Sequence, residues 1–139
     1  MAAQNQILEW EEQYSVGVAL LDQQHQHMFR MINDLVDIIH GVPDAKRVTE
    51  LLDAIVRYKR AHFATEEEYF RQFNYEGAEE HIAEHRKFDE ALTGLKEKHA
   101  GDTFGLAFEL IDFLEDWLVQ HLLHTDQKYK ACFLAHGLK

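Results

Sequence analysis

Histidine is unusually frequent in this sequence, with 10 residues in a chain of 139. Five of the histidines and one glutamate fall in phase with apolar residues that recur every three or four positions, which is the pattern of an inward-facing helical stripe. These six residues are His25, His62, Glu66, His81, His85 and His121. Imidazole and carboxylate groups in such numbers suit iron, and they would also accept zinc or manganese.

The spacing places four of these residues in two pairs. His62 and Glu66 are four residues apart, and so are His81 and His85. Residues four apart lie on the same face of an α-helix. We place Tyr58 on the same inner face as His62, so this helix should point both an imidazole and a carboxylate at the interior.

Burial decides between a metal centre and an ordinary core. A single histidine on an apolar face is more often a hydrogen-bonded core residue than a ligand. Six such groups without partners would each cost about 1–3 kcal/mol, and their sum would exceed the net stability of a small domain. A metal ion supplies all the partners at once, so we expect a metal centre.

Asp126 lies five residues after His121, a spacing that leaves two side chains about 140° apart on a straight α-helix. Taken alone, this spacing favours a surface position for Asp126. The alternative is that the helix loosens, ends or bulges between Leu122 and Thr125, which would turn the carboxylate inward.

The elements that must position these residues are helices, because one Pro and seven Gly leave few interruptions. Amphipathic stripes predict helices at about 20–40, 44–73, 78–98 and 103–124. The short connections, including Pro43, favour an all-α, up-down-up-down antiparallel four-helix bundle, with residues 1–139 forming a single domain. Residues 1–18 should form an irregular arm anchored by Trp10 and Tyr14, and a short C-terminal helical segment should follow the bundle.

Composition narrows the partners and the compartment. The formal net charge of −11 argues against nucleic acid or an anionic membrane as a partner, and an acidic surface favours a monomer. Cys132 is the only cysteine, which excludes an internal disulfide and a thiolate cluster. The N-terminus has no signal-peptide pattern, so we expect a cytoplasmic protein.

The order of the candidate ligands resembles the signature of a known family. His25, then His62-x-x-x-Glu66, then His81-x-x-x-His85, then His121-x-x-x-x-Asp126 is similar to the ligand pattern of the hemerythrins. The N-terminal residues Trp10, Tyr14-Ser15-Val16-Gly17-Val18 and Asp22-Gln23-Gln24-His25 resemble the single-domain bacterial branch of that family.

This resemblance implies that two iron ions share the seven residues. His81, His85 and His121 would bind one iron, and His25 and His62 would bind the other. Glu66 and Asp126 would each bridge both irons, together with a hydroxide or oxide, and the helix end before Asp126 would be distorted. Two octahedral irons would then keep one open position, on the iron with two histidines.

The implied function is reversible dioxygen binding for storage, transport or delivery, by a protein that is not an enzyme. The candidate ligand set has five histidines and two carboxylates and contains no Glu-x-x-His motif. It therefore differs from the carboxylate-rich di-iron sites of other four-helix bundles. Bulky residues around the site should exclude water and favour reversibility: Leu118, Trp117, Phe63, Met28 and Leu122. Met28 and Phe63, taken singly, are equally well explained as core residues. By resemblance, Leu118 lines the dioxygen pocket and Tyr129 lies beside the ligands.

Two alternatives use the same iron pair. One is an enzyme, such as a peroxidase, an oxidase or a nitric-oxide-handling protein, and the other is an iron buffer. An oxygen-consuming enzyme would be the natural recipient for a carrier. The acidic residues Glu67 and Glu68, next to the ligand Glu66, are interpreted as a solvated face.

Overall fold

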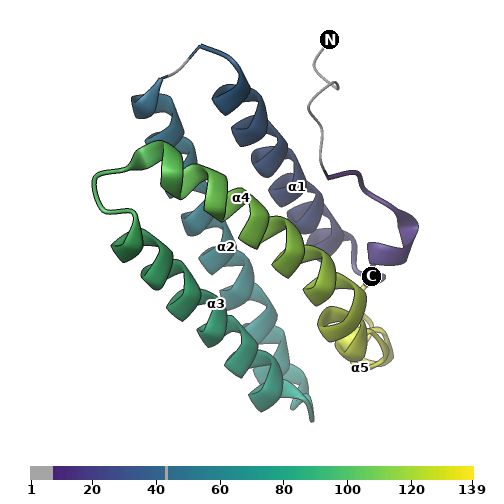
Figure 1. Ribbon diagram of the computed structural model, residues 1–139. Helices are drawn as coiled ribbons and strands as arrows, with labels where there is room; N and C mark the ends of the chain where they lie inside the picture. Colours follow the sequence, from purple (N-terminus) through teal and green to yellow (C-terminus); the bar gives the residue numbers. More distant parts are fainter. Residues whose placement is uncertain (1–7, 43) are drawn as a thin grey trace.

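The structure is a computed structural model that describes residues 8–42 and 44–139. Four long helices form an antiparallel bundle with short connections: α1 (Ala19–His40), α2 (Ala45–Phe73), α3 (Ala78–Lys98) and α4 (Thr103–Gln120) (Figure 1). The described residues contain no strand, and the predicted all-α four-helix bundle is confirmed. The predictions for residues 1–7 and for Pro43 fall outside the described residues.

The chain departs from a regular α-helix after α4. A π-helical segment, η3 (His121–Thr125), is followed by a 3₁₀ segment, η4 (Asp126–Tyr129), and by the short helix α5 (Lys130–Ala135). We expected the fourth helix to run to about residue 124, but its α-helical part ends at Gln120 because the backbone widens there.

Local chemistry sets the helix ends. The Asp44 carboxylate accepts a hydrogen bond from the Arg47 backbone N–H at 3.2 Å and begins α2. Asp102 accepts from the Gly105 N–H at 3.0 Å and begins α4. Each carboxylate satisfies an N–H that a helix leaves unpaired in its first turn. Asn74 ends α2 in the left-handed conformation, with φ of 50°, which asparagine tolerates.

Two apolar clusters fill the interior. The larger runs along the bundle axis and includes the buried residues Met28, Leu35, Val48, Phe88, Leu110 and Leu118. The smaller lies at the other end and joins the arm to the C-terminal segment through Val16, Val18, Leu21, Phe70, Tyr129 and Phe133. The candidate ligands lie between the two clusters, since α1 passes from Leu21 through His25 to Met28.

The described part of the N-terminal arm is tied to the bundle. Asp22 accepts hydrogen bonds from the Ser15 hydroxyl at 2.5 Å and from the Val16 N–H at 2.9 Å. The rings of Trp10 and Tyr14 pack against Phe29, with centroids 5.6 and 5.4 Å away. These contacts close one side of the bundle near the start of α1.

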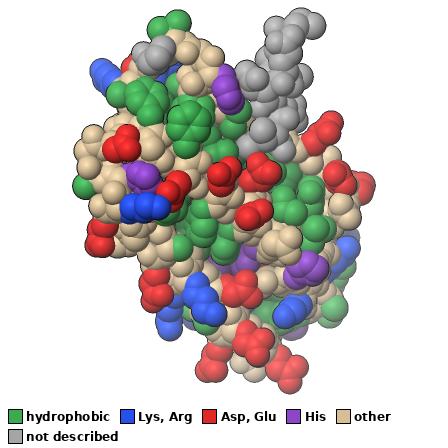
Figure 2. Space-filling view, viewed as in Figure 1, with side chains coloured by type: hydrophobic (Ala, Val, Ile, Leu, Met, Phe, Trp, Pro, Cys, Tyr) green, Lys and Arg blue, Asp and Glu red, His purple; other side chains and the backbone are tan. Residues whose placement is uncertain are grey.

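The surface carries the negative charge expected from the composition. Acidic side chains occur over the whole face seen in Figure 2, with basic side chains between them. None of the described helices combines the length and the apolar character needed to cross a membrane.

Candidate metal centre

Seven polar side chains converge between the two apolar clusters, and none is more than 3% exposed. They come from all four sides of the bundle: His25 on α1, His62 and Glu66 on α2, His81 and His85 on α3, His121 at the start of η3 and Asp126 at the start of η4. The structure therefore brings together every residue that the sequence suggested as a ligand.

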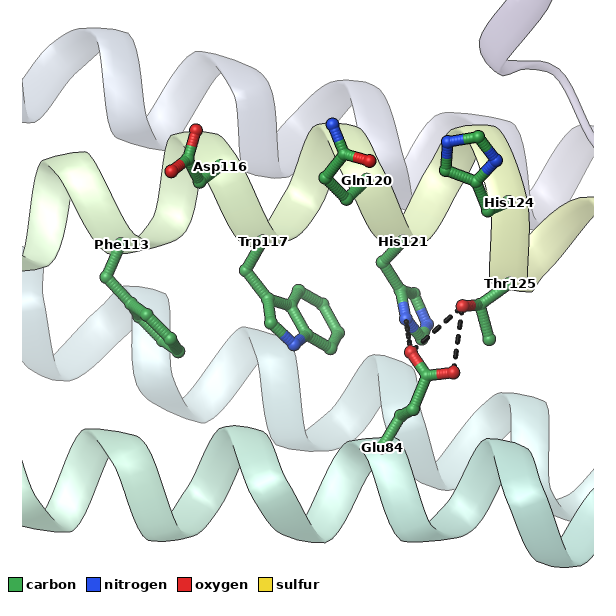
Figure 3. A pocket seen from close by; sticks show the side chains of 8 residues that line it. All are labelled: Glu84, Phe113, Asp116, Trp117, Gln120, His121, His124 and Thr125. Atoms are coloured by element: carbon green, nitrogen blue, oxygen red, sulfur yellow. Dashed lines mark hydrogen bonds and ion pairs between the residues drawn. The ribbon is translucent and has the colours of Figure 1, made fainter.

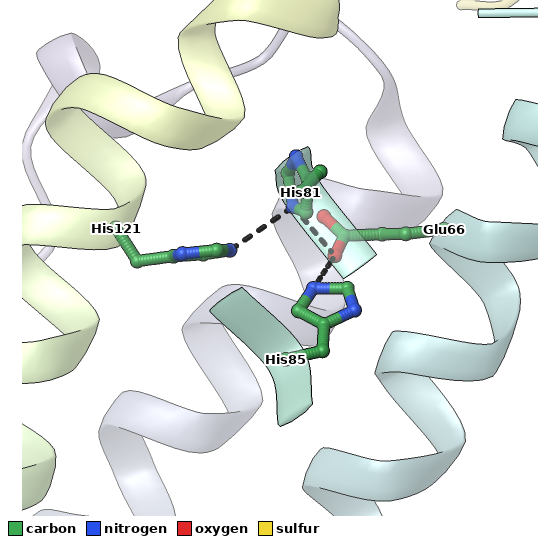
Figure 4. Close-up of side chains that lie close together, drawn as sticks. All are labelled: Glu66, His81, His85 and His121. Atoms are coloured by element: carbon green, nitrogen blue, oxygen red, sulfur yellow. Dashed lines mark hydrogen bonds and ion pairs between the residues drawn. The ribbon is translucent and has the colours of Figure 1, made fainter. Parts of the chain in front are cut away.

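The side chains form two groups whose donor atoms lie within 4.8 Å of one another. One group contains three histidines and a carboxylate, Glu66, His81, His85 and His121 (Figure 4). The other contains two histidines and two carboxylates, His25, His62, Glu66 and Asp126. Each group is large enough to hold one metal ion, so the geometry suits two ions side by side.

Both carboxylates reach both groups. Glu66 Oε1 lies 3.2 Å from His85 Nε2, whereas its Oε2 lies 3.4 Å from His62 Nε2. Asp126 Oδ1 lies 2.8 Å from His121 Nε2, and its Oδ2 lies 3.2 Å from His25 Nε2. A carboxylate with one oxygen toward each group has the orientation of a bridging ligand.

The π-helical segment explains how Asp126 turns inward. Its backbone N–H donates to the His121 carbonyl oxygen, a hydrogen bond that spans five residues instead of the four of an α-helix. Because the turn holds one extra residue, side chains five apart share a face. The surface position favoured by the spacing alone is therefore wrong, and the inward position is the one observed.

The donor atoms need a cation. Glu66 Oε1, both Asp126 carboxylate oxygens and His85 Nε2 are buried without a hydrogen-bond partner. His25 Nε2 and His62 Nε2 face each other at 2.9 Å, which brings two lone pairs together unless a proton or a metal ion separates them. Buried groups of this kind rarely lack partners, so the donor set fits a pair of metal ions.

Charge favours the ionised carboxylates. Burial alone would raise the pKa of Glu66, but the neighbouring His62, together with the close imidazoles of His81 and His85, holds that pKa well below its usual range. Burial and the nearby Glu66 would raise the pKa of Asp126, but His121 and His25 hold it well below its usual range. Both carboxylates are thus ready to bind a cation.

Hydrogen bonds behind the imidazoles fix their orientation. His62 Nδ1 donates to Gln24 Oε1 at 2.6 Å, and His85 Nδ1 donates to Glu67 Oε2 at 2.8 Å. A proton held on Nδ1 leaves the Nε2 lone pair free to face the centre. The interpretation of Glu67 as part of a solvated face was wrong, because its partner lies on another helix and leaves no trace in local sequence spacing.

Glu84 plays the same part for the third histidine. His121 Nδ1 donates to Glu84 Oε1 at 3.3 Å, and the Thr125 hydroxyl donates to the same carboxylate at 2.9 Å (Figure 3). The hydrogen bond from His121 lowers the pKa of Glu84 to about 2, so this acceptor stays charged. Sequence reasoning missed Glu84, since nothing in the order of residues links it to His121.

Tyr129 lies against a bridging carboxylate. Its side chain is fully buried, and its hydroxyl donates to Glu66 Oε2 at 2.6 Å. Burial, together with the charges of Asp126 and Glu66, raises the pKa of Tyr129 well above its usual value. The phenol therefore stays protonated and remains a donor.

Apolar side chains enclose the centre. The residues suggested for a small-molecule pocket are buried or half-buried: Met28, Phe63, Trp117, Leu118 and Leu122. Phe63 stacks on His85 with centroids 3.7 Å apart, and Trp117 stacks on His121 at 4.1 Å. A cavity of about 540 Å³ lies beside this layer and is lined in part by Glu84, Trp117 and Thr125 (Figure 3).

Comparison with known proteins agrees with this geometry. Residues 16–133 match the sequence model of the family described as Hemerythrin HHE cation binding domain. A myohemerythrin of Theromyzon tessulatum is 32% identical over 123 residues, which are 88% of this chain and 91% of that protein. A bacteriohemerythrin of Methylococcus capsulatus is 31% identical over 124 residues, covering 88% and 93% of the two chains.

A solved structure shows the same relation. The crystal structure of wild-type hemerythrin superposes with a TM-score of 0.78 at 30% identity, over 91% of this chain and 97% of that one. Fold, cation-binding geometry and sequence agree along most of the chain. The chain belongs to the hemerythrin family.

Proposed function

We propose that this chain binds dioxygen reversibly at a pair of iron ions held by the seven converging side chains. The observation that carries the proposal is that both carboxylates have one oxygen toward each of the two donor groups. We assign His81, His85 and His121 to one iron and His25 and His62 to the other, with Glu66 and Asp126 bridging. A hydroxide or oxide would complete the bridge.

The unequal histidine count supports one open position, on the iron with two histidines. The iron pair, when bound, supplies the reversible electron donation that dioxygen binding requires. The chain's own residues do the rest. Hydrogen bonds from the three Nδ1 atoms hold the imidazoles in place, and the Tyr129 hydroxyl fixes Glu66. Leu118 and Leu122, which are 2% and 0% exposed, keep water away from the centre.

The wider biological setting stays a prediction from the sequence. Delivery of oxygen to an oxygen-consuming enzyme, a monomeric state and a cytoplasmic location all agree with an acidic chain of this size. The apolar enclosure favours storage or delivery over oxidation of a substrate, because water and protons have poor access to the bound ligand.

The test is a cycle of oxygenation. The purified chain is loaded anaerobically with Fe(II), exposed to O₂ and purged with argon, while its visible spectrum and iron content are followed. We expect one O₂ per two irons and loss of the coloured form on purging. Irreversible oxidation within one cycle would contradict a carrier and favour an oxidase or peroxidase.

Two histidines three residues apart provide a matched control. His121 is 3% exposed at the centre, whereas His124 is exposed on the same segment. His121→Gln should lose at least one iron and all reversible oxygenation, and His124→Gln should keep both. Equal behaviour of the two variants would show that the ligand assignment is wrong.

A further inference from the structure

Lys59 is the only lysine or arginine among the described residues whose side chain is buried, with 3% exposed. It lies on the inner face of α2, one turn before His62. No carboxylate oxygen within the described chain lies within 4.0 Å of its Nζ. The ammonium instead lies over three aromatic rings, with centroids 4.3 Å away for Trp117, 5.0 Å for Phe63 and 5.8 Å for Phe88.

A charge in this position is costly for the fold. Burial lowers the pKa of Lys59 to about 8, and the carboxylates of Asp126 and Glu66 oppose that shift. The aromatic faces recover part of the lost hydration, because a ring attracts a cation along its face. An apolar side chain of the same length would fill the space without any loss of hydration, so packing alone does not account for the ammonium.

The three rings connect Lys59 to the metal centre. Phe63 and Trp117 stack on His85 and His121, so the ammonium lies only one ring behind the imidazoles. Phe63 and Trp117 also belong to the proposed lining of the dioxygen pocket. Since charges separated by protein rather than by water interact strongly, an anion in that pocket would be attracted by the ammonium.

We propose that Lys59 is a specificity-determining residue that makes the small-molecule pocket prefer small monovalent anions over neutral molecules of the same size. The inference rests on the proposed function, because the pocket is defined by the iron pair. The ammonium lies inside the bundle against the three rings, so its effect comes from the folded interior rather than from an exposed side chain.

The test uses azide, a small linear anion, as the probe. Iron-loaded, oxidised protein is titrated with azide, and the dissociation constant is read from the visible absorption. Lys59→Met removes the charge and keeps the length, and we expect it to weaken azide binding by about tenfold or more. Lys59→Arg keeps the charge, and its azide affinity should stay within about threefold of wild type.

Two controls separate charge from damage. Lys46→Met makes the same change in net charge at an exposed position near the start of α2, where salt screens it, so azide affinity should not change. Nitric oxide, which is neutral, should bind reduced wild-type protein and Lys59→Met with similar affinity. An equal loss for azide and nitric oxide, or unchanged azide affinity, would overturn the inference.

A second readout needs no iron. Trp117 is half-buried and lines the cavity of about 540 Å³, and its indole is the ring nearest to Nζ. In a Trp10→Phe background, iodide should quench Trp117 fluorescence more strongly when Lys59 is present than in the Lys59→Met variant, while neutral acrylamide should quench both equally. If the wild-type chain takes up no iron, the proposed function fails and this comparison alone decides on Lys59.

Discussion

The residues behind the ligands differ between the two halves of the centre. His85 and His121 donate to carboxylates, Glu67 and Glu84, whereas His62 donates to the neutral amide of Gln24. An imidazole backed by a carboxylate is a stronger electron donor to its metal than one backed by an amide. The iron with three histidines should therefore be the easier of the two to oxidise.

Tyr129 provides a prediction at the scale of one atom. Tyr129→Phe removes the hydroxyl that donates to Glu66 at 2.6 Å and leaves that buried carboxylate with one partner fewer. We expect iron affinity to fall by about 10- to 100-fold and the free energy of unfolding of the metal-free chain to fall by about 1.5–3 kcal/mol. Competition with a calibrated chelator and urea unfolding measure the two effects.

Tyr69→Phe is the matched control for that change. Tyr69 lies on α2 and packs on Phe73 and Phe133, away from the ligands. Iron affinity should not change when its hydroxyl is removed. A Tyr129→Phe variant that binds iron as tightly as Tyr69→Phe would show that the hydroxyl has no role in holding the bridge.

At the residue scale, spacing and type predicted most of the site. The helical repeat places His62 with Glu66 and His81 with His85 on inner faces, as observed. One turn earlier we placed Tyr58 on the inner face, and it is half-buried and packs against the larger apolar cluster. Its neighbour Lys59 is more deeply buried, and the apolar pattern gives no sign of a charged residue in the interior.

Among the elements, η3 shows why local rules fail at a functional position. Its five-residue hydrogen bond adds one residue to the turn, and no residue type in the segment signals this. The resemblance to a known family supplied the inward position of Asp126, whereas helical geometry alone gave the opposite answer. Glu67 and Glu84 were missed for a related reason, because contacts between helices depend on helix packing that one sequence does not encode locally.

The extra residue of η3 can be tested by changing the length of the segment. Deleting the exposed His124 leaves Asp126 four residues after His121. Side chains four residues apart share a face on a regular α-helix, so the variant should still bind two irons. Inserting one alanine after His124 makes the separation six residues and turns the carboxylate away. Iron per chain after desalting should then fall below two.

The two length variants change the backbone to a similar degree, so each controls for the other. Circular dichroism should show the same helix content in both. Loss of iron from the deletion variant as well would mean that the wide turn itself, rather than the direction of the carboxylate, is needed at this position.

Over the whole molecule, the metal centre joins elements that are distant in the sequence. Residues from His25 to Asp126 meet between two apolar clusters, so a metal ion that binds them stabilises the folded state alone. At a free metal concentration one thousand times the dissociation constant, binding should add about 4 kcal/mol to the free energy of unfolding. Removing the metal should therefore lower the stability of the entire bundle.

Urea unfolding with and without metal measures this contribution. The midpoint should fall in the metal-free chain, and the dependence of the free energy on urea should stay the same if the fold is kept. His121→Gln should show a much smaller difference between the two conditions than His124→Gln. A midpoint that does not depend on metal in the wild-type chain would contradict a centre that connects all four helices.

The position of the centre between two apolar clusters also controls how fast metal is exchanged. The seven side chains are at most 3% exposed, and the smaller cluster ties the N-terminal arm to α5 across one end of the bundle. Because the donor atoms are enclosed, a bulky chelator reaches a bound ion only after part of the bundle opens. The rate at which iron is lost is then set by the opening of the fold, whereas the amount lost at equilibrium still measures ligand affinity.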